Sequence, residues 1–265
     1  MTKRRIIAFI GWILAALILV VGIGALPQKP IAAQGNSTIL ISAAASLKDS
    51  LGEIKQAYQK AKPNVTVNYN FGASGTLLQQ IASGAPADVF ISAGQKQMNE
   101  LQQKSLIVPE TRRNLLTNSV VLIVPKNSNT VTNFRGLTSA NVKRIAVGEP
   151  RSTPVGQYTE EIFKNLGILE QLKPKLTYSN SVRSVLAAVE SRNADAGVVY
   201  ATDAKLSNQV KVVETAAANL HSPVVYPMAV LKNSKNLSAA KEYARFLQSA
   251  NARSIFTKYG FGIAK

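Results

Sequence analysis

The stretch Ile39-Leu40-Ile41-Ser42-Ala43-Ala44-Ala45-Ser46-Leu47 passes from a β-like run, through small residues, into the start of a helix. Three further segments repeat this transition: Val65–Asn70 into Gly72–Gly75, Ile145–Val147 into Pro154-Val155, and Leu176–Tyr178 into Ser181-Val182. The start of a helix presents backbone N–H groups without intrahelical acceptors, together with the positive end of the helix dipole. A sheet that directs several helix starts toward one cleft can therefore hold an oxyanion without any cationic side chain.

Strands and helices alternate along the rest of the chain, which predicts an α/β fold. The first helix is expected from Leu47 to about Lys60, because Leu47, Leu51, Ile54 and Tyr58 recur at helical spacing and Pro63 follows. Ser46 stands where an N-cap residue would stand. With 265 residues, 46% of them hydrophobic, the chain is long enough for two lobes with cores of ordinary size.

Two long apolar runs, Leu115–Val124 and Val224–Leu231, bracket the middle of the chain. We expect each to be a strand and a place where the chain crosses between lobes. The last segment, with helices expected over Leu237–Gln248 and Ala252–Tyr259, should return to pack on the first lobe.

The N-terminus has the composition of an export signal. Lys3-Arg4-Arg5 precedes an uncharged apolar run, Ile6–Leu26, and a polar exit. Residues 1–33 are therefore expected to be a signal peptide cleaved near Ile31-Ala32-Ala33. The run is also close to the length that spans a bilayer, so an uncleaved anchor stays open. In either case the protein should work outside the cytoplasm, in the periplasm or an equivalent compartment.

The chain has no cysteine and a net charge of +17. The absence of cysteine excludes disulfides, thiolate metal sites and a lipid anchor on cysteine. The basic residues after the leader are scattered and are not interleaved with aromatic residues, which argues against a nucleic-acid partner. No cluster of histidines or carboxylates has the spacing of a metal site. A solvated basic surface, which raises the encounter rate with a small anion, is the simplest interpretation.

Several stretches after the leader follow a family pattern, and they occur in the expected order: Ala43–Leu47, Phe71–Leu77, Gly84–Ala93, Ala146–Pro150, Pro154–Tyr158, Val182-Arg183, Gly197–Tyr200 and Tyr259–Phe261. On these residues the chain resembles bacterial periplasmic molybdate-binding proteins, the substrate-binding components of molybdate ABC importers. The resemblance implies a type II periplasmic-binding-protein fold, in which two α/β lobes are joined by two crossover strands. The implied lobes are residues 38–117 with 226–265, and residues 118–225.

The resemblance also implies the binding residues, which hold a tetrahedral dianion through neutral donors alone. Ser46 and Ser74 would each offer a hydroxyl and a backbone N–H, Val155 and Val182 their backbone N–H groups, and Tyr200 its phenol. The implied ligand is molybdate or tungstate, the implied partner is an ABC-transporter permease, and the protein is expected to be a monomer without cofactor or direct metal ligands. A site made only of donors suits a fully deprotonated oxyanion.

Other interpretations of the same residues remain open at this point. Ser46 by itself is an N-cap, Ser74 a turn residue and Tyr200 a phenol at the edge of the core, while Asp88 is expected to brace a loop. Sulfate or another tetrahedral oxyanion is an alternative ligand. Rejection of sulfate in favour of molybdate would have to depend on the size of the cavity, and competition titrations distinguish the two ligands. A secreted serine hydrolase is a more remote alternative, because His221 is the only histidine and Gly72–Gly75 is not a GxSxG nucleophile elbow. We therefore expect a binding protein and no enzyme.

Overall fold

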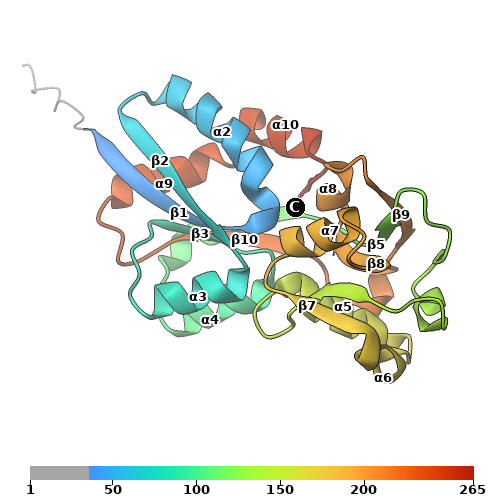
Figure 1. Ribbon diagram of the computed structural model, residues 1–265. Coiled ribbons are helices and arrows are strands. Elements are labelled where there is room, and N and C mark those ends of the chain that lie inside the picture. The colour runs from blue at the N-terminus through green and yellow to red at the C-terminus, as the bar shows by residue number, and fades with distance from the viewer. Residues whose placement is uncertain (1–35) are drawn as a thin grey trace, which may run out of the picture. The chain divides into compact units, whose positions relative to one another are not determined.

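The computed structural model describes residues 36–265, which form two β-sheets (Figure 1). The first sheet has the strand order β11-β4-β10-β3-β1-β2. Strand β1 pairs in parallel with β2 and β3, whereas β10 is antiparallel to β3 and β4. Its strands are β1 Ser37–Ala44, β2 Val65–Gly72, β3 Val89–Ile91, β4 Arg113–Thr117, β10 Val225–Val230 and β11 Gly262–Ile263.

The second sheet has the order β7-β6-β8-β5-β9. Strand β6 pairs in parallel with β7 and β8, and β5 is antiparallel to β8 and β9. Its strands are β5 Val120–Pro125, β6 Ile145–Gly148, β7 Leu176–Ser179, β8 Ala196–Tyr200 and β9 Val210–Thr215. Both sheets thus combine parallel strands with an antiparallel strand inserted among them, β10 in the first sheet and β5 in the second, and the first sheet has a second antiparallel strand, β11, at its edge.

The chain passes between the sheets at Asn118-Ser119. The prediction of one continuous strand over Leu115–Val124 is wrong, because this run is divided into β4 in the first sheet and β5 in the second. The side-chain oxygen of Asn118 accepts a hydrogen bond from the N–H of Ser119, a local bond that competes with strand pairing. The return passage lies between β9 and β10. We propose that each sheet is the centre of one lobe, with the boundaries given above, and we call them lobe 1 and lobe 2.

Helices cover both faces of the first sheet (Figure 1). Side chains alternate across β3: Val89 and Ile91 belong to the apolar cluster that includes α2, α9 and α10, whereas Phe90 packs with α3 and α4. The predicted helical face of α2 is buried, with Leu51, Ile54 and Tyr58 all in the core. These helices are α2 Lys48–Ala61, α3 Ser74–Ala82, α4 Gln95–Gln103, α9 Leu237–Phe246 and α10 Ala250–Lys258.

The second sheet is covered by its own helices. Both α5 and α7 contact β6 and β8, and α8 contacts β5, β8 and β9. The α-helices here are α5 Pro154–Asn165, α6 Leu169–Leu172, α7 Val182–Glu190 and α8 Ala201–Lys205. Short 3-10 turns complete the described chain: η1 Ala45–Leu47, η2 Pro109–Thr111, η3 Arg135–Thr138, η4 Lys173–Lys175 and η5 Ala218–Leu220.

The expectations for residues 1–33, a signal peptide or an anchor, lie outside the described residues. Within residues 36–265, the helices are too short or too polar to cross a bilayer.

Candidate functional site

One small cavity brings together all five residues predicted to bind the ligand. Its volume is about 20 Å³. Its walls come from both sheets, and the lining residues are Ala44, Ala45, Ser46, Gly72, Ala73, Ser74, Ala93, Thr153, Pro154, Val155, Ser181, Val182 and Tyr200. None of these described residues is charged. Two larger grooves, of about 730 and 810 Å³, contain none of the five.

Four of the five residues lie in the first turn of a helical segment. Ser74 and Val182 are the first residues of α3 and α7, Val155 is the second residue of α5, and Ser46 is the second residue of η1, which leads into α2. N–H groups at these positions have no intrahelical acceptor. The four strand-to-helix transitions of the sequence therefore converge on one place.

In the first turns of α5 and α7, one further donor each is satisfied by capping. Thr153 is the N-cap of α5 and accepts from the N–H of Gly156 at 3.1 Å, and its hydroxyl donates to the carbonyl of Glu149. The hydroxyl of Ser181, the N-cap of α7, accepts from the N–H of Ser184 at 3.2 Å. Capping thus uses the hydroxyls of Thr153 and Ser181.

Ser74 keeps its hydroxyl proton available. Its Oγ accepts a hydrogen bond from the N–H of Ala93 at 3.0 Å. Since the oxygen is used as an acceptor, the proton is free to point at a ligand in the cavity. Ser74 is buried, at 1% exposure, so this donor cannot turn to bulk water.

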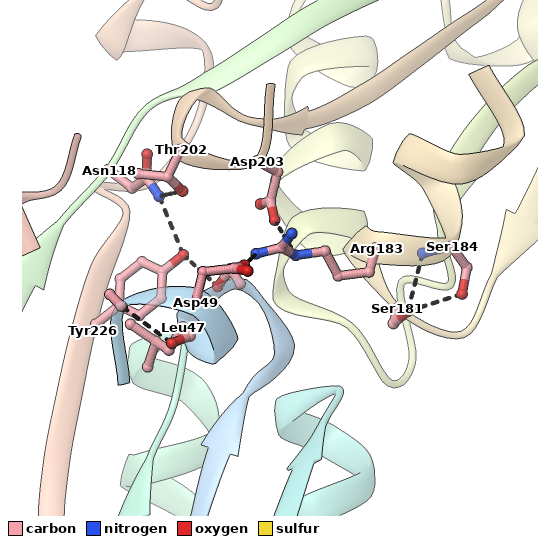
Figure 2. Close-up of polar contacts among 11 residues, drawn as sticks. Leu47, Asp49, Asn118, Ser181, Arg183, Ser184, Thr202, Asp203 and Tyr226 are labelled. Atoms are coloured by element: carbon pink, nitrogen blue, oxygen red, sulfur yellow. Dashed lines mark hydrogen bonds and ion pairs between the residues drawn. The ribbon is translucent and has the colours of Figure 1, made fainter. Parts of the chain in front are cut away.

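Ser46 is not an N-cap, contrary to the expectation from sequence. The chain enters α2 through η1, and the N-cap positions of η1 and α2 are Ala44 and Leu47, neither of which makes a side-chain cap. The Oγ of Ser46 instead lies 2.9 Å from the hydroxyl of Tyr226. That hydroxyl accepts from Asn118 Nδ2 at 3.3 Å (Figure 2). Tyr226 can therefore give its own proton to Ser46, which leaves the proton of Ser46 for a ligand.

Tyr200 supplies the third free hydroxyl. It ends β8, is 1% exposed, and its hydroxyl has no hydrogen-bond partner within the described chain. Burial raises the pKa of the phenol well above its ordinary value, so the group stays protonated and remains a donor. A buried hydroxyl without a partner is unfavourable, and this one lines the cavity.

The start of α3 and the loop before α5 come into close contact beside the cavity. The N–H of Gly75, the second residue of α3, donates to the carbonyl of Ser152 at 2.9 Å. A Cβ atom at Gly75 would lie 2.5 Å from that carbonyl oxygen, so only glycine fits. This contact joins the first turn of α3 to the loop before α5, next to the lining residues Ser74 and Thr153.

Sequence reasoning missed the residues that support the site. Tyr226 and Asn118 orient Ser46, yet in the sequence they are an aromatic residue in an apolar strand and a polar residue at a strand end. Contacts across more than 100 residues, such as Asn118 with Tyr226, leave no local signal.

The other residues noted in the sequence have structural surroundings. Asp88 is a brace, as expected: one carboxylate oxygen accepts from the N–H of Leu40 at 2.7 Å and the other from the hydroxyl of Ser234 at 2.5 Å. His221 Nδ1 lies 2.7 Å from the carbonyl of Ser222, and its ring packs on Tyr158. Residues 36–265 contain no group of three histidines or carboxylates placed to hold a metal ion.

Residues 39–262 match the family described as bacterial extracellular solute-binding protein, and the chain belongs to this family. Among its relatives, a putative ABC transporter substrate-binding lipoprotein YvgL of Bacillus subtilis is 41% identical over 94% of this chain and 95% of its own length. The molybdate-binding protein ModA of Haemophilus influenzae is 38% identical over 85% of this chain and 90% of its own length.

Solved structures agree with the family. The substrate-binding domain of a putative molybdenum ABC transporter from Clostridium difficile has a TM-score of 0.68 at 44% identity, covering 86% of this chain and all of that domain. The periplasmic molybdate-binding protein of Azotobacter vinelandii has a TM-score of 0.78 at 22% identity, with the same coverage. The expected fold class, the α/β fold of the periplasmic binding proteins, is therefore confirmed.

Proposed function

We propose that this protein captures molybdate outside the cytoplasm and delivers it to an ABC importer, and that it accepts tungstate as well. The observation that carries the proposal is the cavity in which three free hydroxyls, of Ser46, Ser74 and Tyr200, meet the unpaired N–H groups of Val155 and Val182. The relatives named above, which are molybdate-binding proteins and ABC-transporter substrate-binding proteins, support the same ligand and the same partner.

The chemistry of the donors favours a fully deprotonated oxyanion. Hydrogen phosphate would present its own O–H to a donor, and both groups would be left unpaired at a cost of about 1–3 kcal/mol. Molybdate, tungstate and sulfate all lack such a proton at neutral pH. Sulfate is discriminated by size, because S–O bonds are shorter than Mo–O bonds and a smaller anion cannot reach every donor of a rigid cavity. Tungstate, nearly the same size as molybdate, is expected to bind.

The anion acts by favouring the closed arrangement of the two lobes. Ser46 and Ser74 belong to lobe 1, and Val155, Val182 and Tyr200 to lobe 2, so one anion bonds to both lobes only when they are together. A ligand that binds one state more tightly shifts the population toward it. The permease would then receive the closed, loaded form.

We further propose that residues 1–33 export the chain, either as a cleaved signal or as a retained anchor, and that the protein works as a monomer. We propose no reaction for the site. The nearest polar partners of Ser46 and Ser74 are Tyr226 and Ala93, and that of the His221 ring is Ser222, an arrangement that favours binding over hydrolysis.

A thermal-shift panel tests the choice of ligand. A ligand that binds the native state alone raises the unfolding temperature. Molybdate and tungstate should each raise the midpoint of the purified protein, while hydrogen phosphate at the same concentration should leave it unchanged. A shift with phosphate equal to that with molybdate would reject the donor-only interpretation of the cavity.

A further inference from the structure

Three charged residues lie just after three of the residues that line the cavity. Arg183 follows Val182 on α7, Asp49 comes three residues after Ser46 at the start of α2, and Asp203 comes three residues after Tyr200 on α8. Figure 2 shows the guanidinium of Arg183 between the two carboxylates. The position of each charged group is thus tied through one helical turn to the position of a binding group.

The guanidinium forms ion pairs in both lobes. Its Nε lies 2.8 Å from Asp203 Oδ1, within lobe 2, and its Nη2 lies 2.5 Å from Asp49 Oδ2, in lobe 1. Asp203 is fully buried, whereas the side chains of Arg183 and Asp49 are 27% and 42% exposed. Arg183 thus pairs with Asp203 within lobe 2, and its ion pair with Asp49 joins lobe 2 to lobe 1.

We propose that Arg183 is a positioning residue for anion binding: held by Asp203, it docks the first turn of α7 against the first turn of α2 through Asp49, so that Ser46, Val182 and Tyr200 reach the anion together. The inference rests on the proposed function, since it concerns the same site. The ion pair of Arg183 with Asp49 would be a second contact between the lobes, in addition to the hydrogen bond from Gly75 to Ser152 at the first turn of α3.

Arg183 differs both from an ordinary surface ion pair and from a cation that attracts the anion directly. The planar guanidinium presents separate nitrogens to two carboxylates, which a lysine cannot do in the same geometry. The ion pair with Asp203 already restricts the Arg183 side chain, so little further freedom is lost when it also pairs with Asp49. The guanidinium is paired with carboxylates, and neither Arg183 nor its partners line the cavity.

Replacing Asp49 by Asn tests the role without disturbing the buried pair. Asp49→Asn keeps the ion pair of Arg183 with Asp203 and should fold as the wild type, which urea unfolding of the ligand-free protein verifies. The matched control is Glu53→Gln, one turn further along α2. Glu53 bonds to Lys258 and Tyr259 of the same lobe, so this variant removes the same charge without touching lobe 2. Release of radiolabelled molybdate into excess unlabelled anion gives the dissociation rate constant of the full-length protein.

We expect Asp49→Asn to speed dissociation about twofold to fivefold, the range for a partly exposed ion pair, and to leave the association rate constant near that of the wild type. The dissociation rate constant of Glu53→Gln should stay near that of the wild type. The loss of a negative charge alone would strengthen anion binding in both variants. Equal dissociation from Asp49→Asn and Glu53→Gln would therefore overturn the positioning role while the proposed function stands. A wild-type protein that does not bind molybdate would overturn both.

Discussion

The hydroxyl of Tyr200 is buried, protonated and without a partner among the described residues. Such a group destabilises the ligand-free protein and stabilises the complex, because the same hydroxyl lacks an acceptor in one state and finds a charged acceptor in the other. Its effects on stability and on affinity should therefore have opposite signs.

Tyr200→Phe separates these two effects. The variant should weaken molybdate binding by about 1–3 kcal/mol, since a charge-assisted hydrogen bond is lost. The ligand-free protein should be as stable as the wild type or more stable, because an unsatisfied hydroxyl is removed. Calorimetric titration and urea unfolding measure the two quantities, and a loss of stability with unchanged affinity would show that Tyr200 is only a core residue.

Ser46→Ala and Ser74→Ala should each weaken molybdate binding by a similar amount, about 1–3 kcal/mol. Ser191→Ala is the control, since the hydroxyl of Ser191 bonds only to carbonyls of its own helix at the end of α7. Titrations of the three variants under one set of conditions give the comparison. Wild-type affinity in both Ser46→Ala and Ser74→Ala would reject the assignment of the site.

Asp203 should make the free energy of unfolding fall as pH rises, the opposite of the usual effect of a carboxyl group. Burial raises its pKa to about 7 from an ordinary value of 3.8, and the charges around it are the cation of Arg183 and the carboxylate of Asp49. The folded state therefore holds more protons than the unfolded state between these values, so the contribution of Asp203 to the free energy of unfolding falls as pH rises from about 4 to 7.

Urea unfolding of ligand-free protein at pH 5 and at pH 8 tests this sign. Glu53 and Glu110 have lowered pKa values, so they add a slope of the opposite sign, most of it below pH 5 and equal in the two proteins compared. The wild type should lose more stability between the two pH values than Asp203→Asn does. Identical slopes for the two proteins would show that Asp203 does not titrate in this window.

At the scale of elements, the close approach of α3 to the loop before α5 depends on Gly75. Gly75→Ala would place a Cβ atom 2.5 Å from the backbone oxygen of Ser152, a clash that no side-chain rotation relieves. The lobes should then fail to close fully. Molybdate affinity should fall by about tenfold or more, because each loss of about 1.4 kcal/mol of binding free energy raises the dissociation constant tenfold.

Gly52→Ala is the matched control for this substitution. Gly52 lies within α2, and a Cβ atom there has no neighbour within 4 Å. The change should leave affinity as it is and raise stability by about 0.5–1 kcal/mol through helix propensity. If Gly75→Ala binds molybdate as tightly as Gly52→Ala does, the contact with Ser152 has no part in closure.

The elements near the site were predictable where the signal is local. Helical spacing identified α2, and small residues after strands identified the four helix starts. The division of Leu115–Val124 into β4 and β5 was not predictable, because both halves are apolar and only Asn118 marks the break. The contacts of Tyr226 with Ser46 and of Arg183 with Asp49 join residues more than 130 positions apart, and so depend on the folded chain.

At the scale of the whole molecule, the positive charge of the chain lies outside the lining of the cavity. The residues lining the cavity are uncharged, although the full sequence has a net charge of +17. Affinity should therefore come from hydrogen bonds within a closed cavity, while the surface charge affects the encounter rate and is screened by salt. Selectivity between anions of equal charge then rests on the fit of the cavity alone.

Calorimetric titration of the purified protein with molybdate, carried out with and without a large excess of sulfate, tests this account most directly. Donors fixed by two closed lobes should give one-to-one binding whose affinity is the same in both titrations. Loss of the molybdate signal in sulfate would contradict selection by size and would assign the cavity to general oxyanion uptake.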